Sequence, residues 1–225
     1  MSLRASIDLG TQTCLLLIAE WDSVQQAVTR KELDQIAFVR LGQGVDKSHQ
    51  LHPDAMERAR SCLAEYKKQI VTRGLDPAQT ICVATSQARD AQNGAKFFSE
   101  IEAGTGFRFR TLSGDEEAQF TFLGGLLPGM DPAQSVVIDI GGGSTELMAS
   151  SAGKSLDIGA VRFTERFFSG QDPVSDEAFW KCQEAVDAQI MTMAGWREAL
   201  PSQVSLVGVA GTVTTIAAWN EGLAK

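Results

Sequence analysis

The sequence predicts an α/β protein built from two related lobes, and two observations support this fold class. The first is an internal repeat: residues 7–13 read Ile-Asp-Leu-Gly-Thr-Gln-Thr, and residues 138–144 read Ile-Asp-Ile-Gly-Gly-Gly-Ser. The second is that each repeat ends one strand-like segment and begins another, while helix-like segments alternate with strands elsewhere. Two copies of one motif indicate a duplicated lobe, with the two turns facing each other across a cleft.

The first half of the chain contains several strand-like segments and two helix-like ones. Short apolar runs predict strands at residues 3–9, 13–21, 36–41, 80–85 and 107–112. A long helix is predicted over residues 53–73. Pro53 suits its first turn, Gly74 suits its end, and apolar side chains recur at helical spacing at Met56, Ala59, Leu63, Tyr66 and Ile70. A second helix is predicted over residues 96–103.

The second half begins after a cluster of turn residues. Residues 127–132 read Leu-Pro-Gly-Met-Asp-Pro, which predicts a boundary between an N-terminal lobe, 1–127, and a C-terminal lobe, 133–225. A helix starting near Ser113 is predicted before this boundary. After it, the same patterns predict strands at residues 135–140, 145–150, 155–158 and 204–209, and helices at residues 161–168, 175–193 and from 212.

The composition restricts the classes of partner. The 225 residues carry a net charge of −8, and the pI is about 4.8. Nucleic-acid binders hold phosphate backbones with clustered Lys and Arg, so this balance excludes nucleic acid as a partner. A polyanionic substrate must therefore be held locally, by backbone N–H groups, helix N-termini, a few placed cations and a bound metal.

Neither a membrane segment nor a secretion signal is expected. The chain has no run of about 18 apolar residues and no charged-then-apolar leader, so we expect a cytoplasmic protein without a membrane partner. The cysteines Cys14, Cys62, Cys82 and Cys182 are scattered and form no C-x-x-C pair. We therefore expect reduced thiols, with neither a disulfide nor a zinc site.

The two repeated turns have the residue types of phosphate-binding loops. Glycine at the tip of a strand–turn–strand lets backbone N–H groups approach phosphate oxygens, and Thr or Ser hydroxyls add donors. Each turn taken alone is also compatible with an ordinary hairpin. Because both carry an aspartate before the first glycine, Asp8 and Asp139 are candidates to hold Mg²⁺ or its water shell. The run Gly141-Gly-Gly143 is not a dinucleotide fingerprint, because Glu146 stands where that motif needs glycine.

The acidic start of the helix near Ser113 supplies a candidate base. Ser113 and Glu116 have the spacing of a capping box, in which Glu116 reaches back to the Ser113 N–H group. Glu117 has no role in that box and points about a hundred degrees away, so it is the better candidate to accept a proton from an attacking water. The alternative is that both acids only complement the helix dipole.

Other residues are weaker candidates. Arg89, which follows a strand at the start of a short helix, is a candidate to hold a phosphate group or to form a surface ion pair. Gly211 and Thr212 lie in a third strand-to-helix turn, suited to a nucleotide, a phosphate or packing alone. Arg162 and Arg166 have the spacing to face the cleft, but we expect them on the solvated surface, as we do His49 and His52.

The motifs taken together resemble the exopolyphosphatase / guanosine pentaphosphatase family, which has the actin-like ATPase (ribonuclease H-like) fold with two lobes. The resemblance extends in order along nearly the whole chain. It rests on both repeats, on Ala84-Thr-Ser-Gln-Ala-Arg-Asp-Ala-Gln-Asn-Gly94, Leu112-Ser-Gly-Asp-Glu-Glu-Ala118, Leu156-Asp-Ile-Gly-Ala-Val-Arg162 and Gly208-Val-Ala-Gly-Thr-Val-Thr-Thr215, and above all on Gly-Gly-Gly-Ser-Thr-Glu-Leu at residues 141–147. The family shows Gly-Ser-Asn-Ser where this chain has Gly-Thr-Gln-Thr. Its core also continues past the third turn, so the resemblance implies either a compact variant or an incomplete C-terminal lobe here.

The resemblance implies a role for each matching residue. Glu117 would be the general base, and Asp139 and Glu146 would help to hold the catalytic water and a divalent cation, Mg²⁺ or another. The phosphate-binding residues would be Gly10, Thr11, Gln12, Thr13, Arg89, Gly141, Gly142, Gly143 and Ser144. The implied reaction is hydrolysis of a terminal phosphoanhydride of polyphosphate or guanosine pentaphosphate. A homodimer is expected from the resemblance alone.

Two other functions remain open at this point. An actin-class, ATP-dependent small-molecule kinase would share both turns and transfer the phosphate to an acceptor instead of water. A phosphate or nucleotide sensor would bind without turnover. A catalytic Glu117 distinguishes the hydrolase from both.

Overall fold

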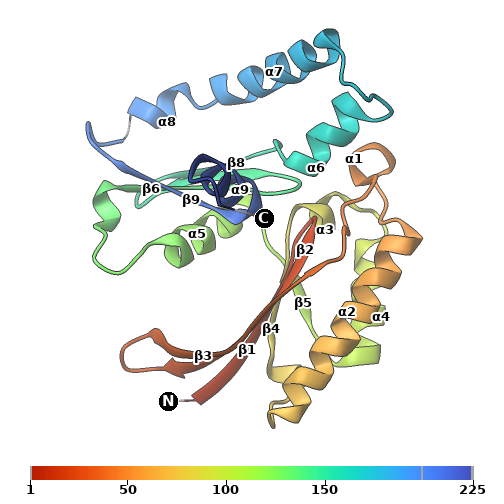
Figure 1. The fold of residues 1–225 in the computed structure, drawn as a ribbon. Helices are drawn as coiled ribbons and strands as arrows, with labels where there is room; N and C mark the ends of the chain where they lie inside the picture. Colours follow the sequence, from red (N-terminus) through yellow and green to blue (C-terminus); the bar gives the residue numbers. More distant parts are fainter. Residues whose placement is uncertain (1, 199, 224–225) are drawn as a thin grey trace. The chain divides into compact units, whose positions relative to one another are not determined.

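The computed structural model describes residues 2–198 and 200–223, which fold into two units, Met1–Leu112 and Ser113–Lys225 (Figure 1). This division differs from the boundary predicted at residues 127–132. Helix α5 (Gly114–Gly125) belongs to the second unit because it packs against strands of that unit's sheet. Residues 199, 224 and 225 of the predicted C-terminal lobe lie outside the described residues.

The first unit contains a five-stranded sheet in the order β3-β2-β1-β4-β5. Its strands are β1 (Ser2–Leu9), β2 (Thr13–Asp22), β3 (Ala27–Phe38), β4 (Ile81–Ala84) and β5 (Phe109–Thr111). β1, β2 and β3 form an antiparallel meander, whereas β1, β4 and β5 run parallel. Alternate residues of β1 face the core, so Ala5, Ile7 and Leu9 are buried while Asp8 points to the opposite face.

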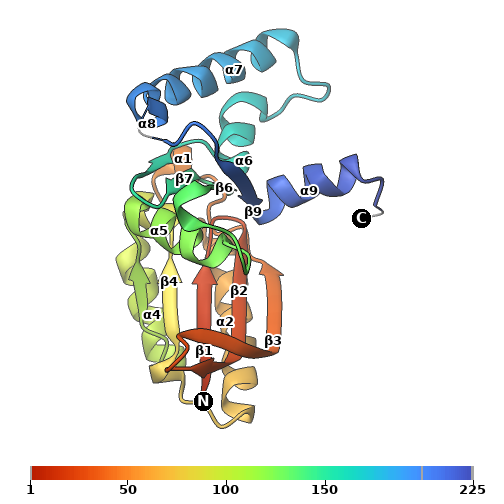
Figure 2. The same cartoon turned by 90° about the vertical axis from the view of Figure 1, so that its left-hand side faces the viewer.

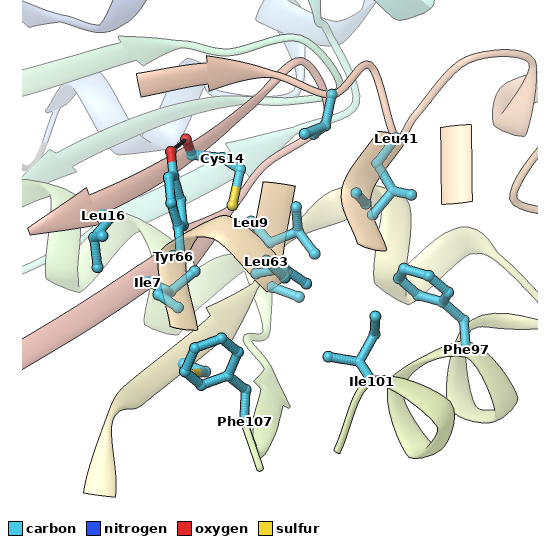
Figure 3. Close-up of a cluster of buried hydrophobic side chains, with 14 of the residues drawn as sticks. Ile7, Leu9, Cys14, Leu16, Leu41, Leu63, Tyr66, Phe97, Ile101 and Phe107 are labelled. Atoms are coloured by element: carbon cyan, nitrogen blue, oxygen red, sulfur yellow. Dashed lines mark hydrogen bonds between the residues drawn. The ribbon is translucent and has the colours of Figure 1, made fainter. Parts of the chain in front are cut away.

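Helices α2 (Pro53–Thr72) and α4 (Gly94–Thr105) lie side by side on one face of this sheet (Figures 1 and 2). The helix predicted over residues 53–73 is confirmed as α2, and its core-facing side chains recur at every third or fourth position. Figure 3 shows the resulting core, in which the Tyr66 hydroxyl donates a hydrogen bond of 2.8 Å to the Cys14 carbonyl. The remaining elements are short: α1 (Val45–Ser48), η1 (Pro77–Gln79) and α3 (Ser86–Asp90).

The second unit repeats the strand pattern of the first. Its sheet has the order β8-β7-β6-β9, formed by β6 (Ser135–Ile140), β7 (Thr145–Ala149), β8 (Gly153–Leu156) and β9 (Ser205–Val209). β6, β7 and β8 form an antiparallel meander and β9 runs parallel to β6, as β4 does to β1. The predicted duplication is therefore confirmed at the level of sheet topology.

The helical elements of the second unit include α5, which lies along the sheet (Figure 1). The others are η2 (Pro132–Gln134), α6 (Ala160–Phe163), the π-helical η3 (Thr164–Phe168), α7 (Asp176–Met191), α8 (Ala194–Glu198) and α9 (Ala210–Asn220). α9 follows β9 directly, as the predicted third turn requires. Within residues 2–198 and 200–223, none of the helices has both the length and the apolar character needed to cross a bilayer.

The third strand was predicted wrongly at residues 36–41, since β3 begins at Ala27 and ends at Phe38. Its first half is polar because it is an exposed outer strand, and it is held partly by ion pairs such as Arg30 with Glu20 at 3.0 Å. A pattern that relies on apolar residues cannot detect a strand of this kind.

Candidate active site

The predicted site residues fall into two groups, one in each unit. Asp8, the turn of residues 10–13 and Arg89 belong to the first unit. The second unit holds Glu117, Asp139, Glu146 and the turn of residues 141–144, and it brings these residues together.

The first turn is held through its carbonyl groups. Gly10 N–H donates to the Thr13 carbonyl (2.8 Å). The N–H group of residue 42 donates to the Thr11 carbonyl (2.9 Å), and those of residues 40 and 39 donate to the Gln12 carbonyl (3.0 and 3.1 Å). In a trans peptide the C=O and N–H groups point in opposite directions. The N–H groups of Gln12 and Thr13 are therefore directed away from residues 39–42, which is the arrangement of an anion-binding nest.

The side chains around the first turn anchor it inside the unit. The Thr11 hydroxyl lies 2.9 Å from Ser86 Oγ and donates to Gln87 Oε1 at 3.2 Å. Thr11 is only 7% exposed, so its hydroxyl serves the fold and its main chain is the part left for a ligand. Arg89, on the same short helix as Ser86, donates from Nη1 to the Leu112 carbonyl (2.9 Å).

The second turn has the same kind of support. Gly141 N–H donates to the Ser144 carbonyl (3.0 Å), and the Gly141 carbonyl accepts from Ala160 N–H (3.0 Å). The Gly142 carbonyl accepts from the N–H groups of residues 161 and 162, at 2.9 and 3.0 Å. The N–H groups of Gly142 and Gly143 are therefore directed away from residues 160–162.

One glycine in each unit makes this support sterically possible. A Cβ on Gly159 would lie 2.3 Å from the Gly142 carbonyl oxygen and 2.4 Å from the Gly143 carbonyl carbon. A Cβ on Gly42 would lie 2.2 Å from Thr11 Cγ2. Sequence reasoning assigned no role to either residue. The available signal was a glycine that follows the third strand of each repeat.

A row of paired residues crosses the second sheet next to this turn. Val209 of β9 pairs with Asp139 of β6, Asp139 pairs with Glu146 of β7, and Glu146 pairs with Ser155 of β8. Directly paired residues present their side chains on the same face of a sheet. We call these four residues the cross-strand row. In the first unit Asp8 corresponds to Asp139, but its partner on β2 is Leu15.

Helix α5 covers the face that carries the cross-strand row. A Cβ on Gly114 would lie 2.7 Å from Ser155 Cβ, and one on Gly125 would lie 3.0 Å from Val137 Cγ1 and 3.2 Å from Val209 Cγ1. These two glycines let the helix approach the sheet closely at both ends. Glu117 follows Gly114 by three positions, so it lies on the same side of the helix, facing the row.

The helix start confirms the predicted capping box. Ser113 Oγ accepts from Glu116 N–H (3.2 Å), and Glu116 Oε2 accepts from Ser113 N–H (2.9 Å). The Glu116 carboxylate is thus used in the cap, and Glu117 is the first-turn acid whose charge acts on Glu146.

Burial raises the proton affinity of two acids of the site, Glu146 and Asp139. Glu146 is 1% exposed, and burial, followed by the charge of Glu117, raises its pKa to about 7. Hydrogen bonds oppose this shift, including one of 2.7 Å from Ser155 Oγ to Glu146 Oε1 and one from Ser144. Burial also raises the pKa of Asp139, against a hydrogen bond with Thr121. The cluster therefore favours either a proton or a cation among its carboxylates.

The carboxylates of Asp139 and Glu146 can supply part of the coordination shell of Mg²⁺. Among residues 2–198 and 200–223 there is no group of three or more His, Cys, Asp and Glu side chains placed to hold a metal. The adjacent pair Asp139 and Glu146 instead supplies two carboxylates. Mg²⁺ commonly takes one or two carboxylates and completes its shell with water and phosphate oxygens. The residues present therefore fit a cation that is bound together with its substrate.

One prediction about the surroundings was wrong and several were confirmed. Arg162 was expected in solvent, but its side chain is only 11% exposed and its Nε donates to the Gly143 carbonyl at 2.6 Å. Arg166, His49 and His52 are exposed as predicted. All four cysteines are free thiols. Gly211 is exposed and Thr212 half-buried in the first turn of α9.

The shifted pKa of Glu146 predicts how stability depends on pH without divalent cations. Its folded pKa of about 7 exceeds its ordinary value of 4.5. The folded chain therefore binds more protons than the unfolded chain between these values. The contribution of Glu146 to the free energy of unfolding is therefore fully present below pH 4.5. It is lost as the pH rises through about 7, a change of about 3 kcal/mol.

Urea denaturation in EDTA at several pH values between 4.5 and 8 measures this effect. In Glu146→Gln, the part of the pH dependence of the unfolding free energy that comes from residue 146 should disappear. An equal pH dependence of the two proteins would show that the pKa of Glu146 is not raised in the folded state.

Comparison with known proteins gives one consistent family. The chain matches the model of the Ppx/GppA phosphatase family over residues 18–223. It is 35% identical to exopolyphosphatase 2 of Mycobacterium tuberculosis (strain ATCC 25618 / H37Rv), over 97% of this chain and 71% of that protein. It is also 36% identical to a bifunctional 3-dehydroquinate synthase/phosphatase of Fusobacterium nucleatum, over 95% of this chain but only 33% of that protein.

A solved structure matches the fold as well. An exopolyphosphatase-like protein aligns with a TM-score of 0.85 and 34% identity, over 98% of this chain and 69% of that chain. Together with the repeated sheet topology, this agreement confirms the predicted two-lobed, actin-like fold class.

Proposed function

The chain belongs to the Ppx/GppA phosphatase family, and we propose that it removes the terminal phosphate of inorganic polyphosphate, guanosine pentaphosphate or both. Its exopolyphosphatase relatives indicate a phosphoanhydride hydrolase. The observation that carries the proposal is the position of Glu117, which faces Asp139 and Glu146 where the second turn begins. A base, a metal-holding pair and a phosphate-binding turn are thus adjacent within one unit.

The second turn has the geometry to bind the phosphate that is transferred. Its carbonyls are held from behind by residues 159–162, so the N–H groups of Gly142, Gly143 and Ser144 are available to equatorial phosphate oxygens. These donors are fixed before the substrate binds, so they stabilise developing charge without reorganising. A bound Mg²⁺ at Asp139 and Glu146 would neutralise phosphate charge.

Glu117 would accept the proton of the attacking water. Its neighbour Glu146 is a buried acid whose pKa is raised to about 7 by burial and by the charge of Glu117. A carboxylate in such surroundings is a stronger base than one in water. In this proposal Asp139 and Glu146 help to hold the metal and the catalytic water, and Glu117 accepts the proton.

We include the first unit as a second phosphate-binding element. The first turn, at residues 10–13, is supported in the same way as the second, and Asp8 stands where Asp139 does. Arg89 adds a fixed cation. Chains of phosphate carry repeated negative charge, which suits more than one nest of N–H groups. A homodimer is proposed from the family resemblance alone.

Release of orthophosphate tests this function. With MgCl₂ the protein should release orthophosphate from long-chain polyphosphate or guanosine pentaphosphate, and excess EDTA should reduce the rate to background. ATP consumption only in the presence of an acceptor would support the kinase instead. Binding of phosphate without turnover by the folded protein would support the sensor.

A further inference from the structure

Arg162 is a buried cation directly behind the second turn. Its side chain is 11% exposed, and its Nη2 lies 3.8 Å from Asp157 Oδ1. Its Nε donates to the Gly143 carbonyl at 2.6 Å, while its own backbone N–H donates to the Gly142 carbonyl at 3.0 Å. A single residue therefore holds two consecutive carbonyls of the turn.

These two contacts determine the directions of two N–H groups. The Gly142 carbonyl shares its peptide plane with the Gly143 N–H, and the Gly143 carbonyl shares its plane with the Ser144 N–H. Because each carbonyl points towards Arg162, each N–H points away from it. The Nε contact is a charge-assisted hydrogen bond, which is stronger than one between neutral groups.

A side chain is needed here for a reason found in the sequence. Residues 141–143 are all glycine, and glycine restricts its backbone angles less than any other residue. In the first turn, main-chain N–H groups of residues 39–42 hold both Thr11 and Gln12. In the second turn the main chain of residues 160–162 reaches Gly141 and Gly142, and the Gly143 carbonyl is bound by the Arg162 side chain.

We propose that Arg162 is a positioning residue that fixes the Gly143–Ser144 peptide so that the Ser144 N–H is presented to a phosphate oxygen. This inference rests on the proposed function for the identity of the ligand, a phosphate group. Lysine cannot replace arginine here, because the donor that binds Gly143 is the Nε of a planar guanidinium. Removal of the Arg162 side chain leaves the acidic residues of the site in place and makes the orientation of the Ser144 N–H less fixed.

The test compares binding of inorganic phosphate by the ¹⁵N-labelled full chain and by its variants. In the parent chain, phosphate should shift the amide resonances of Gly142, Gly143 and Ser144. Arg162→Met and Arg162→Lys should each weaken phosphate binding about tenfold, the effect expected for loss of a charge-assisted hydrogen bond. They should also speed hydrogen exchange of the Ser144 amide. Arg166→Met, which alters an exposed arginine four residues on, should bind phosphate like the parent.

Several outcomes decide the matter. Parent-like phosphate affinity in a folded Arg162→Lys or Arg162→Met variant overturns the inference. So does a parent chain in which phosphate does not shift the amide resonances of the second turn. Thermal unfolding identifies any variant that does not fold, in which case the other variant decides. If the parent binds phosphate at this turn but releases none from polyphosphate, the proposed hydrolase fails and the role of Arg162 in binding stands. With active enzyme, the Arg162 variants should raise KM more than they lower kcat.

Discussion

Glu117→Gln should lower the rate of orthophosphate release from polyphosphate by about a thousandfold, the range expected when a general base is removed. The substitution keeps the size of the side chain and removes its ability to accept a proton. Glu117 faces the cross-strand row, and its charge raises the pKa of Glu146. Its loss should therefore also lower the pKa of Glu146 and leave phosphate binding by the second turn intact.

The adjacent acid provides a matched control for this variant. Glu116→Gln makes the same chemical change one position earlier, and glutamine can still accept the hydrogen bond from Ser113 N–H that closes the capping box. Its rate and its stability should remain close to those of the parent. Equal activity of Glu117→Gln and Glu116→Gln, measured under saturating substrate, would contradict the assignment of the base.

Gly159→Ala should lower the free energy of unfolding of the second unit by about 3 kcal/mol, the upper part of the usual range for overpacking. Gly159 has φ −146° and ψ 148°, a conformation open to any residue, so the obstacle is space alone. The new Cβ would meet main-chain atoms of Gly142 and Gly143 at 2.3 to 2.5 Å. Backbone cannot rotate away as a flexible side chain does, so the turn must shift and phosphate binding should be lost with it.

Gly124→Ala is the control for this change. It is the same substitution in the same unit, at a helical position where a Cβ meets no atom within 4 Å. There alanine should raise stability by about 0.5 kcal/mol, because it restricts the unfolded chain and favours the helix. Denaturant unfolding and phosphate titration of both variants give the comparison. A Gly159→Ala protein with parent-like stability and binding would show that residues 159–162 do not support the turn.

The sequence predicted those parts of the fold and site that depend on local patterns. The capping box of Ser113 and Glu116, the helix over residues 53–73 and the repeated turns all rest on residues within a few positions of one another. The polar first part of strand β3 was missed because it is held in the sheet by its pairing with β2, and its sequence lacks the apolar pattern of a strand. Local signals therefore identified most elements and the centre of each turn.

The parts that could not be predicted depend on contacts between distant segments. Arg162 lies behind Gly143, 19 residues away in the chain, and only the folded sheet shows this. Ser155 and Thr121 gained their roles from strand register and from the helix that covers the row. A charged or hydroxyl side chain gives no local sign of such partners, which is why Arg162 was expected in solvent.

The pairing of Asp8 with Leu15, compared with that of Asp139 with Glu146, shows where the chemistry of the two repeated units differs. The two units share one strand pattern, but the residue paired with the aspartate is a leucine in the first unit and a glutamate in the second. The two units are thus alike in sheet topology and differ in the side chains next to the repeated turn. Among the described residues, the second unit therefore carries a carboxylate pair at this position of the strand register, and the first unit does not.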